Sequence, residues 1–442
     1  MRLVSTRGSS PNLVNGPSSW NGSGLVVAKM EEGAPGVVWV GVYDDALQTL
    51  AEDRPVATDV RTIVALVWNG TEHGLFYTAT TGGLLLQRLS PAGQPIGGPV
   101  SVTDKTVYFG DDIDVVWSDA LNAYVVGRVI TEGRFRGLWL TLVERSGAIR
   151  SDRQAPVSAS SQSELDLAVT ETGMIGAFFN NAAGSIAFAV TGAEGGIAVR
   201  ALVPRSTFIA AVAQDGLFIL TYAAPVENQP KTEIRWLVID SAQQIVRPDA
   251  RLIAPTGDAA WPLALISNGE ELALAYIDAP RGIQNIDQEY RLRRFAIDGT
   301  TISDTRFSGE QVALSRGQSP YDFVWTGTSY ISAPVHAGSD RLNSYLNRYC
   351  PLVADIVSPT RNVRIGENVV FSGNASGGVP GYEFFWNFSF ESAQKRGQTI
   401  ERVFDRTGTF QVTLSVVDAS GAVSRETITV NVVRPRSRAV RH

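Results

Sequence analysis

A short turn motif that recurs along most of the chain constrains its fold more than any other feature. In four copies a strand ends in tryptophan and runs into a polar turn, at Trp20, Trp68, Trp117 and Trp325. Three more copies keep the apolar strand and the polar turn without the tryptophan, at the corresponding positions 169, 213 and 266. Successive copies are 44 to 59 residues apart. The chain therefore contains seven copies of one unit of roughly fifty residues.

Each copy has the pattern of four short strands. A second apolar strand follows the tryptophan turn, as in 74–78, and glycine-containing turns such as those at Gly93, Gly147 and Gly299 separate later strands. Strands that are apolar at nearly every position are typical of sheets buried on both faces. We therefore expect an all-β fold in which residues 1–350 form a seven-bladed β-propeller, with six or eight blades as alternatives. The arrangement resembles bacterial propellers in architecture but lacks the WD40 and kelch signatures.

Composition excludes several classes of function. The net charge is −6, which argues against a nucleic-acid binder because phosphate contacts need a basic face. The single cysteine, Cys350, rules out an intrachain disulfide and a cysteine zinc site. No apolar run reaches the length of a membrane span. Residues 1–16 lack the apolar core of a secretory signal, so either the protein is cytoplasmic or a signal is missing from this sequence.

The residue pattern of the sequence changes after Cys350, where short predicted strands alternate with glycine-containing turns. Five stretches resemble the PKD family in order and spacing: 366–372, Pro380-Gly381-Tyr382, Trp386-Asn387-Phe388, Val403-Phe404 and 408–418. The resemblance implies an immunoglobulin-like β-sandwich over 351–434, followed by a basic disordered tail at 435–442. Family members usually continue after the second strand with a Gly-Asp-Gly-like turn. Here 389–392 read Ser-Phe-Glu-Ser, which puts any calcium role of that turn in doubt.

The aromatic residues of this module are predicted to be core rather than a sugar-binding platform. Tyr382, Phe384 and Trp386 alternate along one strand, so their side chains share one face. A large ring well inside a strand packs between two sheets.

Stacking the seven copies brings out the best candidate site. We call the tryptophan, or the residue that corresponds to it in the other copies, the repeat position. Three residues before it, three copies carry aspartate, at Asp114, Asp166 and Asp322, and Asp112 lies close by. On the innermost strands these carboxylates would line the central channel and hold a cation or a polar ligand. The alternative is that they bond backbone amides of neighbouring blades or line a water-filled channel. Trp261, next to a proline at a channel end, is the candidate for ligand stacking.

Catalytic and metal signatures are missing from the sequence. The three histidines have no metal spacing and no Ser-His-Asp set can be assembled. No pair among the 44 acidic residues is singled out for glycoside hydrolysis. We therefore expect no catalytic residue, no metal ligand and no cofactor, with calcium as the one ion the acidic residues would suit.

These observations favour a non-enzymatic extracellular or cell-surface protein for binding or adhesion. The propeller would present a face to a protein or glycan on a surface or in the extracellular matrix, and the PKD-like module would act as a spacer or interaction unit. Two alternatives remain open: a polysaccharide-active hydrolase or lyase with its site in the propeller funnel, and a structural subunit of a surface filament or layer. Self-association is compatible with all three. Neither nucleic acid nor membrane insertion is expected.

Overall fold

β-Strands, most of them in antiparallel pairs, make up the described regular structure of this protein. The computed structural model describes residues 2–5, 13–31, 36–103, 112–131, 133, 135–155, 157–158, 164–204, 206–279, 289–306, 323–332, 335–337, 342–357, 361–389, 393–419, 421 and 423–434. The chain divides into two compact units. One comprises Arg2–Thr301 and Arg306–Arg348, and the other contains Ile302–Thr305 and Tyr349–His442. Among the described residues no helix is long and apolar enough to cross a membrane.

Twenty-eight strands of the described structure belong to the first part of the chain. They are β1 (Arg2–Ser5), β2 (Leu13–Trp20), β3 (Leu25–Glu31), β4 (Gly36–Tyr43), β5 (Thr49–Trp68), β6 (His73–Ala79), β7 (Leu84–Leu89), β8 (Pro95–Ser101), β9 (Asp112–Ser118), β10 (Ala123–Ile130), β11 (Gly137–Val143), β12 (Ile149–Gln154), β13 (Leu165–Val169), β14 (Ile175–Asn180), β15 (Ser185–Thr191), β16 (Ala198–Pro204), β17 (Thr207–Gln214), β18 (Leu217–Pro225), β19 (Thr232–Ile239), β20 (Ile245–Ile253), β21 (Ala259–Ser267), β22 (Leu272–Ala279), β23 (Glu289–Phe295), β24 (Thr301–Arg306), β25 (Phe323–Trp325), β26 (Tyr330–Ser332), β27 (Val335–Ala337) and β28 (Leu342–Tyr349).

These strands form seven blades. Blades 1 to 6 are β2–β5, β5–β8, β9–β12, β13–β16, β17–β20 and β21–β24, and β5 is long enough to be the last strand of blade 1 and the first of blade 2. Blade 7 contains β25, β26, β27 and β28, and β1 pairs with β28 at its outer edge. Blade 7 is thus assembled from both ends of the propeller sequence.

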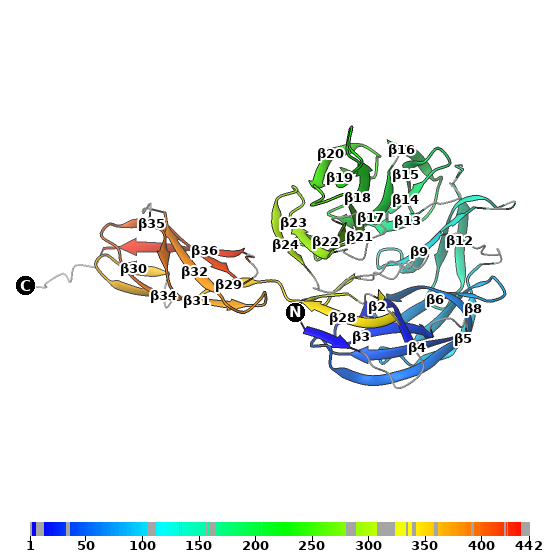
Figure 1. Cartoon of the computed structure of the whole chain (residues 1–442), viewed down its shortest axis with the longest axis horizontal. Helices are drawn as coiled ribbons and strands as arrows, with labels where there is room; N and C mark the ends of the chain where they lie inside the picture. Colours follow the sequence, from blue (N-terminus) through cyan, green and yellow to red (C-terminus); the bar gives the residue numbers. More distant parts are fainter. Residues whose placement is uncertain are drawn as a thin grey trace, which may run out of the picture. The chain divides into compact units, whose positions relative to one another are not determined.

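The first strands of the blades close a ring. Each of β2, β5, β9, β13, β17, β21 and β25 contacts the next, and β25 returns to β2. Figure 1 shows the blades following one another around this ring, coloured from blue at β2 to yellow at β28. The strand pairing confirms the all-β prediction and the count of seven blades. All seven repeat positions fall at or near the ends of these innermost strands.

Burial explains the apolar sequence of the second strands. In β6, β10, β14 and β22 every residue is buried, whereas the outer strand β8 is almost entirely exposed. Apolar clusters lie between consecutive blades; one joins Phe76 and Leu86 of blade 2 to Val115 and Tyr124 of blade 3. Each such fully buried side chain contributes about 1.5–3 kcal/mol, so the blade interfaces hold the ring together.

The turn between the third and fourth strands is repeated with the same geometry. In blades 1, 2, 3, 5 and 6 the second-to-last residue of this turn has a left-handed backbone conformation. These residues are Leu47, Gly93, Gly147, Gln243 and Gly299. A Cβ atom on Gly299 would lie 2.7 Å from the Trp236 ring of blade 5, and Leu47 of blade 1 is packed in the cluster shared with blade 7. Each of these turns therefore docks onto the preceding blade.

The C-terminal unit is a two-sheet sandwich. One sheet has the order β29 (Val353–Val357), β31 (Asn368–Ser376), β34 (Thr399–Val403). The other has the order β30 (Asn362–Arg364), β36 (Val423–Val433), β35 (Gly408–Val417), β32 (Glu383–Phe388), β33 (Lys395–Arg396). These are the strands drawn in orange and red in Figure 1.

The core of this sandwich contains the aromatic residues that the sequence pattern placed there. Phe384, Trp386 and Phe388 are buried on one face of β32, and the Trp386 indole donates a 2.8 Å hydrogen bond to the Gly397 carbonyl. The prediction that Trp386 is core is confirmed. Of the unusual turn, Ser389 exchanges hydrogen bonds with Gln411, and 390–392 lie outside the described residues, as does the tail 435–442.

Candidate functional site

Two aspartates on the innermost strand of blade 3 reach across to the innermost strand of blade 4. The Asp112 carboxylate accepts a 2.6 Å hydrogen bond from the Leu165 amide, and the Asp114 carboxylate accepts one of 2.7 Å from the Leu167 amide. The second oxygen of each accepts the amide of the residue that follows it in β9. Both side chains thus act as acceptors for edge-strand backbone.

The same joint recurs between blades 4 and 5. Glu164 accepts the Ile209 amide at 3.2 Å, and Asp166 accepts the Ala211 amide at 2.7 Å. Glu164 and Asp166 precede their repeat position by the same number of residues as Asp112 and Asp114 precede theirs. Two consecutive joints therefore use one register.

The physical reason lies in the edge of each sheet. An innermost strand pairs on one side only, so its other amides have no ladder partner, and an unpaired buried amide costs about as much as a lost hydrogen bond. Carboxylates from the preceding blade supply the missing acceptors. These contacts are the ones that the alternative interpretation predicts, in which the aspartates bond backbone amides of the neighbouring blade. They do not test the prediction that the same carboxylates also hold a ligand.

Burial and mutual repulsion alter the protonation of this cluster. Burial is the main cause that raises the pKa of Asp112 to about 7, the Leu165 amide opposes the shift, and the Asp114 and Glu164 carboxylates add to it. Burial also raises the pKa of Glu164, against the amide bonds that it accepts. Asp112 is therefore partly protonated near neutral pH, and Glu164 keeps its proton to a higher pH than an exposed glutamate does.

Asp114 and Asp166 are hydrogen-bonded to each other, which requires a proton between them. Burial raises the pKa of both carboxyl groups. Both Asp114 oxygens accept backbone amides and one Asp166 oxygen accepts the Ala211 amide, so the other Asp166 oxygen is the place for the proton that is donated to Asp114. The structure thus brings together three of the four predicted aspartates. Asp322 lies outside the described residues.

Trp261, the predicted stacking residue, lies in β21 and is only 1% exposed. Its ring is stacked on Phe208 of blade 5, with centroids 5.7 Å apart and an interplanar angle of 28°. Phe208 itself is 37% exposed. The aromatic surface open to solvent at this position is therefore that of Phe208. Sequence reasoning missed it, although Phe208 precedes its repeat position by as many residues as Trp261 precedes its own.

At the opposite end of the innermost strands the tryptophan turns form a second set of joints. The Asn69 side chain accepts amides of its own turn and donates a 2.7 Å bond to the Tyr124 hydroxyl of blade 3, where Tyr124 packs on Trp117. Asn21 bonds His73, which packs on Trp68, in the same way. In both joints the tryptophan packs on the ring of its own blade that the asparagine of the preceding blade bonds, which gives Trp68 and Trp117 a structural role.

Two of these joints carry an additional ion pair. Glu72 pairs with Arg88 at 2.7 Å, and Glu271 pairs with Arg294 at 2.6 Å. The Tyr330 hydroxyl of blade 7 donates to Glu271 at 2.7 Å. Both glutamates are buried; Glu72 pairs within blade 2, whereas Glu271 also ties blade 6 to blade 7. The repeated Asn-Gly-x-Glu spacing of 69–72 and 268–271 is the sequence signal for this network.

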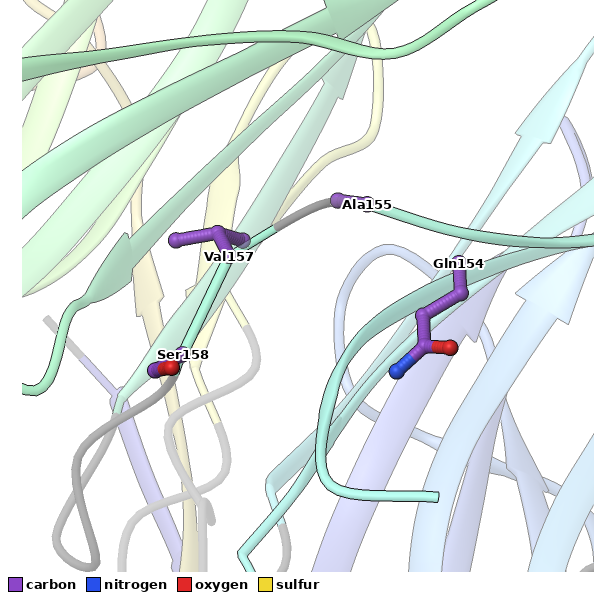
Figure 2. A pocket seen from close by; sticks show the side chains of 4 residues that line it. All are labelled: Gln154, Ala155, Val157 and Ser158. Atoms are coloured by element: carbon purple, nitrogen blue, oxygen red, sulfur yellow. The ribbon is translucent and has the colours of Figure 1, made fainter. Parts of the chain in front are cut away.

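A hollow of about 450 Å³ lies at the start of the connection from blade 3 to blade 4. Figure 2 shows the four residues that line it, Gln154, Ala155, Val157 and Ser158. The Gln154 amide already donates to the Arg136 carbonyl. These four offer one amide, one hydroxyl and two aliphatic groups, so they supply no acid or base. Within the described ranges, no three His, Cys, Asp or Glu side chains gather as a metal site.

Comparison with known proteins identifies the C-terminal unit. Residues 351–432 match the model of the PKD domain. A search of curated proteins gives no match. Similar solved structures include the SapL1 lectin in complex with α-methyl fucoside, 12% identical with a TM-score of 0.44, covering 70% of this chain and 98% of the lectin.

Two further similar structures are AofleA from Arthrobotrys oligospora and the β-propeller domain of the Trilobed protease from Pyrococcus furiosus. AofleA is 12% identical with a TM-score of 0.44, covering 68% of this chain and 87% of its own. The protease domain is 6% identical with a TM-score of 0.44, covering 77% of this chain and 94% of its own. The assignment of blades rests on the strand pairing of this chain itself.

Proposed function

We propose that this protein is a non-enzymatic binding or adhesion protein of the cell surface or extracellular space. Its propeller presents a rigid face to a glycan or protein, and its PKD domain serves as a spacer or interaction unit. PKD domains are typical of extracellular proteins, which supports this location.

The observation that carries the proposal is the engagement of the channel carboxylates. Asp112, Asp114, Glu164 and Asp166 each accept at least one backbone amide of the next blade. A general acid or base must move a proton to or from a substrate, and a nucleophile must reach it. Carboxylates held in blade joints are better suited to fixing the shape of a binding face. This favours binding over the hydrolase or lyase alternative.

The two ends of the propeller also differ in a way that supports a binding face. Because the strands of a blade are antiparallel, the turns after the first and third strands share one end, and they are short, as at 21–24 and 144–148. At the other end lie the strand ends between which the sequence is longest, on either side of 102–111, 155–164, 280–288 and 307–322. Binding residues are concentrated on loops held by a rigid scaffold. We place the binding face at the end with the long connections, where Asp112 begins β9.

A retention experiment tests this function. The purified chain is passed over immobilised chitin, cellulose, laminarin, collagen and fibronectin, and the eluate is assayed for released sugar. We expect retention on at least one support and no product. Release of sugar would overturn the binding proposal in favour of the polysaccharide-active alternative. Absence of retention on all five, together with concentration-dependent assembly in size-exclusion chromatography, would favour the structural-subunit alternative.

The predicted ligand role of the channel aspartates is tested on the same supports. Asp166→Asn keeps an acceptor for the Ala211 amide and a donor for Asp114, so it preserves the joint while removing the carboxylate. Asp112→Asn keeps one of two acceptor oxygens. A retention constant reduced at least tenfold in folded variants supports a ligand contact. Unchanged retention in both leaves these residues a structural role alone.

A further inference from the structure

Phe208 is held in a conformation that a bulky residue rarely adopts. Its φ angle is 51°, in the left-handed region, although it lies within β17 rather than in a turn. The strand has a bulge here, because Thr207 pairs with Ala223 and Ile209 pairs with Tyr222, which leaves Phe208 without an opposite residue. Such strain and such bulges are concentrated at functional sites, where they redirect a side chain.

The surroundings of Phe208 keep it in this conformation. The Glu164 carboxylate of blade 4 accepts the amides of both Phe208 and Ile209. On the other side the Phe208 ring is stacked on Trp261 of blade 6. Trp261 is almost fully buried, and its indole N–H has no hydrogen-bond partner in the part of the chain described. One ring face of Phe208 is therefore covered by Trp261, while 37% of the residue remains exposed.

Carboxyl groups stand at the same level of the innermost strands as this aromatic pair. Asp112, Glu164, Phe208 and Trp261 occupy the same place relative to the repeat position in blades 3, 4, 5 and 6. Four consecutive blades thus place two acids and two aromatics side by side along the end of the propeller with the long connections. The acids are hydroxyl-binding groups, and the exposed ring offers an apolar face.

We propose that Phe208 is the stacking platform of a binding site for a neutral oligosaccharide, and that the oxygen lone pairs of Glu164 and Asp112 that the joint amides do not use meet its hydroxyl groups. This inference rests on the proposed binding function and names the ligand class of that face. A sugar ring combines an apolar C–H face with peripheral hydroxyls, which matches an exposed aromatic ring beside carboxyl groups. Polyanions, including nucleic acids, are disfavoured because the carboxyl groups and the net charge of −6 repel them.

The protonation of the acids suits an uncharged ligand. Burial raises the pKa of Asp112 to about 7 and raises that of Glu164. A protonated carboxyl group both donates and accepts hydrogen bonds, as sugar hydroxyls require, and the raised pKa of Asp112 puts this form within reach at neutral pH.

Affinity electrophoresis of the full chain tests the proposal. The probes are laminarin and galactomannan as neutral polysaccharides and alginate as an anionic one, compared in gels with and without the polysaccharide. We expect retardation by at least one neutral probe and none by alginate. Phe208→Ala is expected to weaken the retarding interaction at least tenfold, and Phe208→Trp, which keeps an aromatic face, is expected to retain most of it. Val246→Ala, at an exposed apolar position of β20, is the control and is expected to behave as wild type.

Folding and function are separated by two further measurements. Phe208→Asn places a residue that tolerates left-handed backbone at this position, so it is expected to fold, with thermal unfolding close to wild type, and yet to lose retardation. Retardation of Phe208→Ala equal to wild type would overturn the Phe208 site and leave the binding function standing. A chain that binds collagen or fibronectin through Phe208 and no neutral polysaccharide would overturn the ligand class alone. A chain that binds none of these probes would overturn both.

Discussion

His73 shows how burial of a single side chain sets a pH limit on stability. The residue is fully buried, its Nε2 atom is 3.4 Å from the Asn21 amide nitrogen, and its Nδ1 atom has no hydrogen-bond partner among the described residues. Burial lowers its pKa to about 4. The equivalent residues in blades 3 and 7 are Tyr124 and Tyr330, whose hydroxyls bond the asparagine of the preceding blade.

We predict that His73→Phe reduces the loss of unfolding free energy that occurs when the pH is lowered. Because the native pKa lies below the unfolded value of 6.5, the unfolded state binds more protons between pH 6.5 and 4, and stability falls as the pH is lowered through that window. The shift corresponds to about 3 kcal/mol. Urea unfolding at pH 7 and pH 4 is expected to show a smaller loss for His73→Phe than for wild type. Equal losses would contradict the assignment of the proton deficit to His73.

The protonated pair Asp114 and Asp166 makes an opposite prediction. Their native pKa values are raised, so the native state binds more protons than the unfolded state above about pH 4, and stability falls as the pH rises through the native values. Asp166→Asn replaces a protonated acid by an amide with the same donor and acceptor. We expect it to match wild type near pH 5 and to exceed it in unfolding free energy at pH 9.

Asp114→Asn is the matched control for the position of the proton. The two Asp114 oxygens accept the amides of Val115 and Leu167. An asparagine offers one acceptor oxygen, so one amide faces an NH₂ group, and we expect a loss of about 1–3 kcal/mol at pH 5. If Asp114→Asn were as stable as Asp166→Asn at that pH, the proton would lie on Asp114 instead.

At the scale of elements, the turn between the third and fourth strands is the part that docks each blade on the preceding one. Gly299 has a φ of 87° and its added Cβ would lie 2.7 Å from the Trp236 ring. Gly327 has a φ of 95°, but nothing lies within 4 Å of its added Cβ. The two glycines therefore share a backbone constraint and differ in packing.

We predict that Gly299→Ala destabilises the protein more than Gly327→Ala does. Gly327→Ala incurs the cost of left-handed alanine alone, about 1 kcal/mol, while Gly299→Ala also displaces Trp236, for a total of about 2–4 kcal/mol. Chemical denaturation of the two variants measures the difference. Equal losses would show that the Gly299 turn does not need close contact with blade 5.

These elements also show what can be predicted from sequence and what cannot. The seven blades were predictable because each copy places a buried strand before a polar turn, with tryptophan in four of the seven, and both signals are local. The acceptors of the inner edge were not, because Asp114 and its partner Leu167 belong to different copies, and pairing depends on the register between blades. Phe208 was missed for the same reason: its importance lies in a bulge and in Trp261, about one repeat away.

For the whole molecule, the critical feature is the closure of the ring between blades 7 and 1. The other joints connect blades that follow each other in sequence, but this one connects residues separated by nearly the whole propeller. Asp45, in the third turn of blade 1, accepts hydrogen bonds from Thr326 at 2.6 Å and Thr328 at 3.0 Å, and pairs with Arg348 at 2.5 Å. Pairing of β1 with β28 adds backbone hydrogen bonds to the same blade.

We predict that Asp45→Ala loosens this closure before the rest of the ring. Burial opposes the shift, but hydrogen bonds from Thr326, Arg348 and Thr328 lower the pKa of Asp45, so its stabilising effect is present at neutral pH and is lost as the pH falls below about 4. We expect a loss of about 1–2 kcal/mol at pH 7, discounted because the side chain is partly exposed.

Hydrogen exchange is expected to accelerate in β26 and β28 and to remain unchanged in β13–β16 on the far side of the ring. Asp298→Ala, in the corresponding turn of blade 6, removes a carboxylate that bonds the Thr300 amide of its own turn and is the control. Uniform acceleration in all blades would show instead that the ring opens as one cooperative unit.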